Sequence, residues 1–135
     1  MVAEPFLPGA DPLLIEQFGL PLLRRLAVLH QQAQQGNGRL PVIALNGPVG
    51  AGKSTLGRQL EALAPRFGLR LMVASIDDLY WPLAERQRRL AGNPFGVNRV
   101  PPGSHDIPLL LGALDRWRGG SELELPHFDK TLAAG

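Results

Sequence analysis

The sequence predicts an α/β protein of three layers, α/β/α with a parallel sheet, and three observations lead to this prediction. A continuous apolar run at 41–45 is typical of a strand buried on both faces, where proline is tolerated at the first position. A glycine-rich loop follows directly at 47–52, and leucines at helical spacing come next. A second apolar run at 69–76 then restores the strand pattern, so strand, loop, helix and strand alternate as in α/β folds.

Other elements are expected on both sides of this unit. Asp11 followed by Pro12 predicts a helix start, because aspartate caps free amides and proline suits the first helical position. Leucines at helical spacing then predict a kinked helix or helical hairpin, so residues 1–38 are expected to be an N-terminal helical segment. Further on we expect a helix over 84–91, a helix capped by Asp106, and a short strand over 122–125.

Composition excludes several functional classes. The chain has 135 residues, of which 44% are hydrophobic and 19% charged, as in a globular domain. It contains no cysteine, which excludes disulfides and thiol catalysis. The formal net charge of +2 gives no argument for nucleic acid, and no apolar run approaches the ~18 residues of a membrane span. We expect a cytoplasmic protein without nucleic-acid or membrane partners, whose oligomeric state stays open.

The loop after the first apolar run has the pattern G-x-x-x-x-G-K-S/T of a phosphate-binding loop (P-loop, Walker A). Glycines there let backbone amides turn towards phosphates, and the following helix points its positive end at the same anion. Lys53 would reach the β- and γ-phosphates, and the Ser54 hydroxyl would be the magnesium ligand. The cofactors are therefore expected to be ATP and Mg²⁺, held by Gly47, Gly50, Ala51, Gly52, Lys53, Ser54 and Thr55.

Among P-loop proteins, the sequence favours a small-molecule kinase. The D-x-x-G and N-K-x-D motifs of GTPases are absent from it, as is the L-S-G-G-Q motif of transport ATPases. Asp77 follows the second apolar run, and ligands of parallel sheets bind at the carboxyl ends of strands. Asp77 is thus the candidate catalytic base, which would accept the proton of an attacking hydroxyl, with Lys53 as the second catalytic residue. The alternative is that Asp77 merely caps a turn, while Asp78 has a supporting role.

Four motifs together resemble the D-glycerate 3-kinases of the plant and fungal type. They are Ser75–Tyr80, Arg99, Pro102–Asp106 and Pro126–Lys130, and the resemblance runs from about residue 42 to 132. These kinases are grouped with uridine kinase, pantothenate kinase and phosphoribulokinase. The resemblance implies that residues 39–135 are the N-terminal part of a P-loop kinase domain. It also implies ATP-dependent transfer to a hydroxyl of D-glycerate, giving 3-phosphoglycerate.

The resemblance also implies a set of substrate-side residues. Arg99 or Lys130 could hold the glycerate carboxylate, since a bidentate arginine suits a carboxylate well. His105 could contact substrate or simply bond loop backbone. The substrate-binding candidates are Asp78, Arg99, His105, Asp129 and Lys130. The arginines at 86, 88 and 89 are expected to form a solvated helix face.

The resemblance predicts an incomplete fold. Members of the kinase group continue beyond the motif at 126–130 into further strands, one of which lies between the two strands predicted here. The chain is therefore expected to be a truncated N-terminal half that is weakly stable and poorly active. Two alternatives stay open, a non-catalytic nucleotide-binding fragment and a kinase for a uridine-like or pantothenate-like acceptor.

Overall fold

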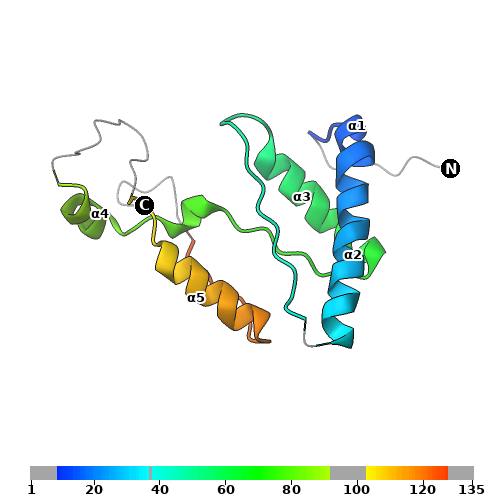
Figure 1. The fold of residues 1–135 in the computed structure, drawn as a ribbon. Coiled ribbons are helices and arrows are strands. Elements are labelled where there is room, and N and C mark those ends of the chain that lie inside the picture. Colours follow the sequence, from blue (N-terminus) through cyan, green and yellow to red (C-terminus); the bar gives the residue numbers. More distant parts are fainter. Residues whose placement is uncertain (1–8, 37, 92–102, 128–135) are drawn as a thin grey trace. The chain divides into compact units, whose positions relative to one another are not determined.

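The computed structural model describes residues 9–36, 38–91 and 103–127, and the chain divides into two compact units, Met1–Val73 and Ala74–Gly135. Each unit is described by itself, and the boundary predicted at residues 38–39 stays a prediction. The elements of the described residues are helical (Figure 1). They are α1 (Pro12–Leu14), a π-helical turn η1 (Ile15–Gly19), α2 (Leu20–Gln35), α3 (Lys53–Leu63), the 3₁₀ turns η2 (Ala64–Phe67) and η3 (Ile76–Leu79), α4 (Leu83–Arg89) and α5 (Ile107–Arg118).

The first unit opens with the helix that the sequence predicts after Asp11. The Asp11 carboxylate accepts hydrogen bonds from the amides of Leu13 (3.0 Å) and Leu14 (3.3 Å), which satisfies two of the free amides of the first turn. The chain then stays helical through η1 and α2 up to Gln35, although a proline stands near the start of α2. A π-helical turn before that proline accommodates the irregularity, because it shifts the bonding pattern locally.

The core of the first unit lies between α2 and the helix that follows the glycine-rich loop. Figure 1 shows α3 beside α2, and leucines from both helices are buried against each other. The 3₁₀ turn η2 continues the packing where Pro65 ends α3, as the sequence predicts. The buried members are Ile15, Leu23, Leu26, Leu56, Leu60, Leu63, Ala64 and Leu69. The N-terminal helix therefore supplies part of the apolar surface that holds α3 in place.

Gly57 in α3 marks a close approach, and it carries a stability prediction. A Cβ at Gly57 would lie 2.9 Å from Val73 Cγ1, whereas one at Gly112 in α5 would meet only the flexible end of Arg116, at 3.4 Å. We expect Gly57→Ala to lower the free energy of unfolding by about 1–3 kcal/mol, because the steric overlap outweighs the better helix propensity of alanine. Gly112→Ala, the matched control, is expected to raise it by about 0.5–1 kcal/mol. Urea unfolding checks both, and a stabilised Gly57→Ala variant would contradict the close packing.

The predicted three-layer α/β/α fold with a parallel sheet is wrong for the part of the chain that the structure describes. Residues 41–45, 69–75 and 122–125 are neither strand nor helix there, and the 76–79 segment is a 3₁₀ turn. Their apolar side chains are largely open, with Val42, Ile43 and Met72 exposed by 45%, 46% and 56%. An apolar run becomes a buried strand only where neighbouring strands pair with its backbone and cover its faces, and these segments have no such neighbours among the described residues.

The second unit is built around the turn that follows the second apolar run. The α5 helix packs on η3, and Leu79 of η3 and Ala113 of α5 are almost completely buried. Asp106 caps α5 as predicted, since its carboxylate accepts a 3.0 Å bond from the Leu109 amide. The predicted helix over 84–91 is confirmed in a shorter form as α4. The turn that carries Asp77 is thus held by its packing against the capped helix α5.

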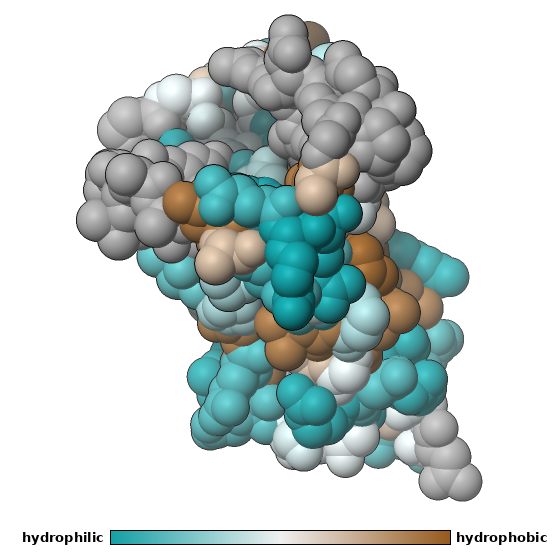
Figure 2. Space-filling model, turned by 90° about the vertical axis from the view of Figure 1, so that its left-hand side faces the viewer, coloured by the Kyte–Doolittle hydropathy of each residue, from teal (hydrophilic) through white to brown (hydrophobic). Residues whose placement is uncertain are grey.

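The surface combines polar and apolar regions. Figure 2 shows apolar patches left open between hydrophilic side chains on one face of the molecule. In the described ranges, no helix has both the length and the apolar character that crossing a membrane requires.

Candidate functional site

The glycine-rich loop of the first unit has the backbone geometry that a phosphate-binding loop needs. Gly50 and Gly52 adopt φ angles of 79° and 87°, in the left-handed region that glycine enters without strain. The Ala51 amide bonds to the Pro48 carbonyl at 3.2 Å, which closes the turn. An added Cβ at Gly50 or Gly52 would meet no described atom within 4 Å. Backbone conformation rather than crowding therefore explains the two glycines.

Lys53 folds back over this loop. Its ammonium group donates to the carbonyl oxygens of Gly47, at 2.6 Å, and of Pro48, at 2.7 Å. An ammonium has three N–H donors, so these two bonds hold it at the loop and leave a third for a phosphate oxygen. The lysine is half-buried, and its stem lies 3.6 Å from the position of a Cβ on Gly47. The positive charge is thus held at the mouth of the loop.

The start of α3 presents further groups for an anion and a cation. Gly52 occupies the N-cap, and no described side chain caps the first turn, so its amides are open to an anionic ligand. Ser54 is exposed in this turn and Thr55 is half-buried. A serine hydroxyl is a hard oxygen donor of the kind Mg²⁺ prefers, and Mg²⁺ usually takes few protein ligands because substrate phosphates and water complete its shell. The described residues contain no cluster of three or more acidic, histidine or cysteine side chains suited to a metal.

The second unit holds the predicted catalytic aspartate in a compact turn. The Ser75 hydroxyl accepts a 3.2 Å bond from the Asp77 amide, and the Ser75 carbonyl accepts a 3.1 Å bond from the Asp78 amide. These bonds close the N-terminal side of η3 and fix the backbone of both aspartates. The predicted relation between Asp77 and the phosphate loop stays a prediction, because the two belong to different units.

The C-terminal side of the turn is joined to the Pro102–Asp106 motif. The Asp106 amide donates to the Leu79 carbonyl at 2.7 Å, and the Trp81 amide donates to the Ser104 carbonyl at 3.1 Å. Between these bonds Tyr80 and His105 form an antiparallel bridge. Their rings stack with centroids 4.4 Å apart and planes inclined by 24°. Tyr80 and His105 are 25 positions apart in the sequence, and their contact brings the two motifs together beside Asp77.

His105 is half-buried, and one of its ring nitrogens is enclosed. Its Nε2 atom is buried and has no hydrogen-bond partner among the described residues. Burial lowers the pKa of His105 below its ordinary value, and the nearby Asp77 carboxylate opposes this shift. In this conformation Nε2 cannot reach a substrate, so the predicted substrate contact of His105 finds no support from that atom.

The lowered pKa of His105 predicts how the stability of the second unit depends on pH. The unfolded chain takes up a proton near the ordinary histidine pKa of about 6.5, whereas the folded chain takes it up only at lower pH. The contribution is therefore complete above pH 6.5 and is lost as pH falls towards the folded pKa. We expect chemical unfolding to show this loss as pH falls below about 6.5, and His105→Phe to reduce it. An equal pH dependence in both proteins would contradict the assignment.

His127 is a site residue that sequence reasoning missed. Its Nδ1 lies 3.3 Å from an Asp78 carboxylate oxygen, although the two are 49 positions apart. The contact brings the start of the Pro126–Lys130 motif to the acidic turn. The His127 side chain is 85% exposed, so the pair adds little stability. The motif itself was the available signal, since His127 stands within it.

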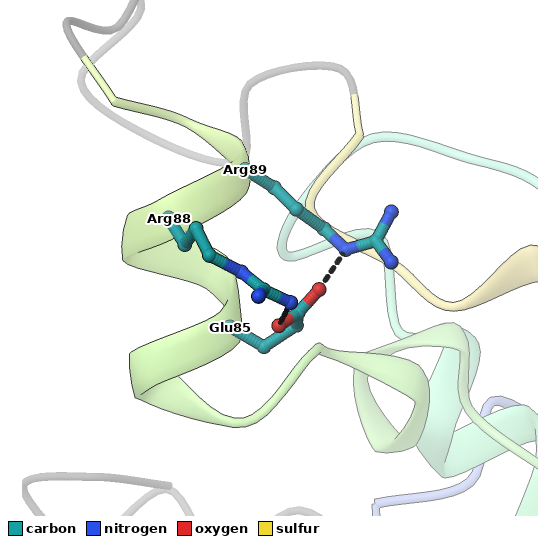
Figure 3. A network of polar contacts seen from close by, with 3 residues as sticks. All are labelled: Glu85, Arg88 and Arg89. Atoms are coloured by element: carbon teal, nitrogen blue, oxygen red, sulfur yellow. Dashed lines mark hydrogen bonds and ion pairs between the residues drawn. The ribbon is translucent and has the colours of Figure 1, made fainter.

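The arginines of α4 form an ionic network with Glu85 (Figure 3). Arg88 pairs with Glu85, and Arg89 donates from Nε to the same carboxylate at 2.5 Å. The hydrogen bond from Arg89 is the main cause that lowers the pKa of Glu85 below its ordinary value. Arg86 lies over the Tyr80 ring at 5.4 Å, and Arg89 lies over Trp81 at 4.0 Å. Arg88 is 76% exposed, Arg89 49%, and Arg86 is half-buried, so the predicted solvated face holds fully only for Arg88.

Three predicted substrate residues lie outside the described residues. They are Arg99, Asp129 and Lys130. The remaining candidate site residues are divided between the two units. The phosphate loop lies in the first unit, and Asp77, Asp78 and His105 lie in the second.

Two kinases are similar to this chain in sequence. It is 32% identical over 103 residues to the uncharacterized kinase mug58 of Schizosaccharomyces pombe, a match that covers 73% of this chain and 37% of the relative. It is 29% identical over 101 residues to the chloroplastic D-glycerate 3-kinase of Arabidopsis thaliana, covering 70% of this chain and 22% of the relative. The chain thus spans well under half the length of either relative. No family model matches it, and neither does a solved structure.

These similarities indicate the class of protein. The chain is a relative of kinases, which are phosphotransferases. Within that class it resembles the D-glycerate 3-kinases, as the four motifs predict.

Proposed function

We propose that the protein is an ATP-dependent phosphotransferase that acts on a hydroxyl group of a small molecule, with D-glycerate as the acceptor and 3-phosphoglycerate as the product. The observation that carries this proposal is the geometry of residues 47–54. Two glycines with positive φ lead there into a helix whose first turn has open amides, and a lysine ammonium lies at the loop. Backbone amides, a helix N-terminus and one compact cation together suit the β- and γ-phosphates of ATP.

On the nucleotide side, each residue has a separate role. Lys53 would donate its free N–H to phosphate oxygens, and the amides of Gly50 and of Gly52 to Thr55 would surround them. Ser54 would hold Mg²⁺ through its hydroxyl. When bound, Mg²⁺ supplies positive charge that offsets the charge developing on the transferred group and the leaving group.

On the acceptor side, Asp77 would act as general base. The acceptor oxygen attacks the γ-phosphorus, and the bond from that phosphorus to the bridging oxygen of ADP breaks. The proton of the attacking hydroxyl passes to the Asp77 carboxylate. Arg99 and Lys130 are proposed for the acceptor carboxylate, and Asp78 and Asp129 for its hydroxyl groups. An organic acid with a primary hydroxyl suits such a mixture of cations and carboxylates.

The experiment measures ADP release by protein expressed from the complete reading frame. The acceptors are D-glycerate, uridine, pantothenate and buffer alone, each with ATP and Mg²⁺. D-glycerate is expected to raise the rate well above the buffer rate, and product analysis should identify 3-phosphoglycerate. Equal rates with and without every acceptor would rule out a small-molecule kinase. Stimulation by uridine or pantothenate instead would leave the kinase but change the acceptor.

A further inference from the structure

The segment that follows Asp77 is held by an unusual combination of contacts. Two backbone bonds, from Asp106 to Leu79 and from Trp81 to Ser104, flank the Tyr80–His105 bridge. Leu79 and Ser104 are each only 1% exposed. Because water does not compete for hydrogen bonds in such a buried pairing, it resists local opening.

The stacked rings complete this pairing. Tyr80 and His105 lie with centroids 4.4 Å apart at a small interplanar angle, an arrangement favourable for flat rings. Arg86 also lies near the Tyr80 ring, so cationic, aromatic and imidazole groups adjoin one another. Tyr80 comes directly after η3, and η3 carries both aspartates. The stacked ring is therefore attached to the residue that ends the turn, three positions after Asp77.

The buried nitrogen indicates what His105 does not do. A buried polar atom without a partner costs free energy of folding, so Nε2 does not serve stability. It is also shielded from any ligand that approaches through solvent. The contact that His105 makes in the fold is the stacking of its flat ring on Tyr80.

We propose that His105 is a positioning residue for the acceptor half of the site: its ring, stacked on Tyr80, fixes the turn that carries Asp77, and its buried Nε2 does not bind the acceptor. This inference rests on the phosphotransferase function proposed above. It replaces the direct substrate contact expected from the sequence with an action through Tyr80 and the backbone of η3.

Two substitutions separate a ring from a polar contact. His105→Phe keeps a flat ring but removes both nitrogens, whereas His105→Gln keeps polar atoms but removes the ring. If His105 positions the turn, the phenylalanine variant retains a kcat close to that of the unchanged protein. The glutamine variant loses about 10²-fold in kcat, the scale expected for a small misplacement of a catalytic group, with KM for ATP unchanged. A substrate contact predicts the reverse order, with KM for the acceptor raised in His105→Phe.

The assay uses protein from the complete reading frame with D-glycerate, at a temperature below the unfolding transition of every variant. A kcat loss in His105→Phe as large as in His105→Gln would overturn the inference, and so would full activity of both variants. Should the glutamine variant fail to fold, His105→Leu, which also removes the flat ring, takes its place in the comparison with His105→Phe. An unchanged protein that transfers no phosphoryl group would instead refute the proposed function, so the two failures are distinguishable.

Discussion

Lys53→Ala is expected to lower kcat for phosphoryl transfer by about 10²–10³-fold, the usual loss when one group that stabilises developing charge is removed. The ammonium already lies at the loop through bonds of 2.6 and 2.7 Å to two carbonyl oxygens. It therefore needs little reorganisation to meet phosphate oxygens. ATP titration is expected to show weaker binding as well, because in the proposed function the lysine would contact the nucleotide before and during transfer. Initial rates at saturating D-glycerate measure the effect.

Two further variants make the Lys53 result specific. Lys53→Arg keeps the charge but replaces a compact ammonium by a planar fork, and it is expected to lose most activity too. Arg58→Ala removes an exposed cation elsewhere on α3 and is expected to leave kcat unchanged. Full activity of Lys53→Ala, with the same unfolding transition, would exclude the phosphate loop from the reaction.

Asp77→Asn is expected to lower kcat by about 10²–10⁴-fold while leaving ATP binding nearly unchanged. The amide has the size of the carboxylate but cannot accept the hydroxyl proton, and general bases contribute on this scale. The backbone of the turn should persist, because its bonds run through the Ser75 side chain and main-chain groups. Transfer rates and ATP titration measure the two quantities separately.

The control for Asp77 is Asp106→Asn. Asparagine caps helices about as well as aspartate, so α5 should keep its first turn and the enzyme its rate. If Asp77→Asn lost ATP binding and transfer together, Asp77 would have a structural role rather than that of a base.

Helices were predictable where the signal was local. Asp11 and Asp106 each cap a helix within three residues of themselves, and Pro65 ends α3 at the expected place. The strands over 41–45 and 69–76 were wrong because a strand depends on partners elsewhere in the chain. An apolar run indicates that burial is favourable, but it does not indicate which partner strands are present. In the described residues these runs stay open instead.

Within the candidate site, local backbone conformation was predictable, whereas the roles of its residues stay predictions. The positive φ angles of Gly50 and Gly52 follow from a motif contained in nine consecutive residues. By contrast, the contact of His127 with Asp78 and the stack of His105 on Tyr80 join distant positions. No local pattern encodes such distances. The motifs gave the residue types that meet, but only the structure gives the pairs.

The open apolar runs have a consequence for the protein in solution. Residues 41–46 and 71–76 contain no charged side chain, and they are rich in valine, isoleucine and leucine. Uncharged segments of this composition, when exposed, associate with copies of themselves through main-chain pairing. Self-association of the protein at high concentration will therefore depend on these two segments rather than on the net charge of the chain.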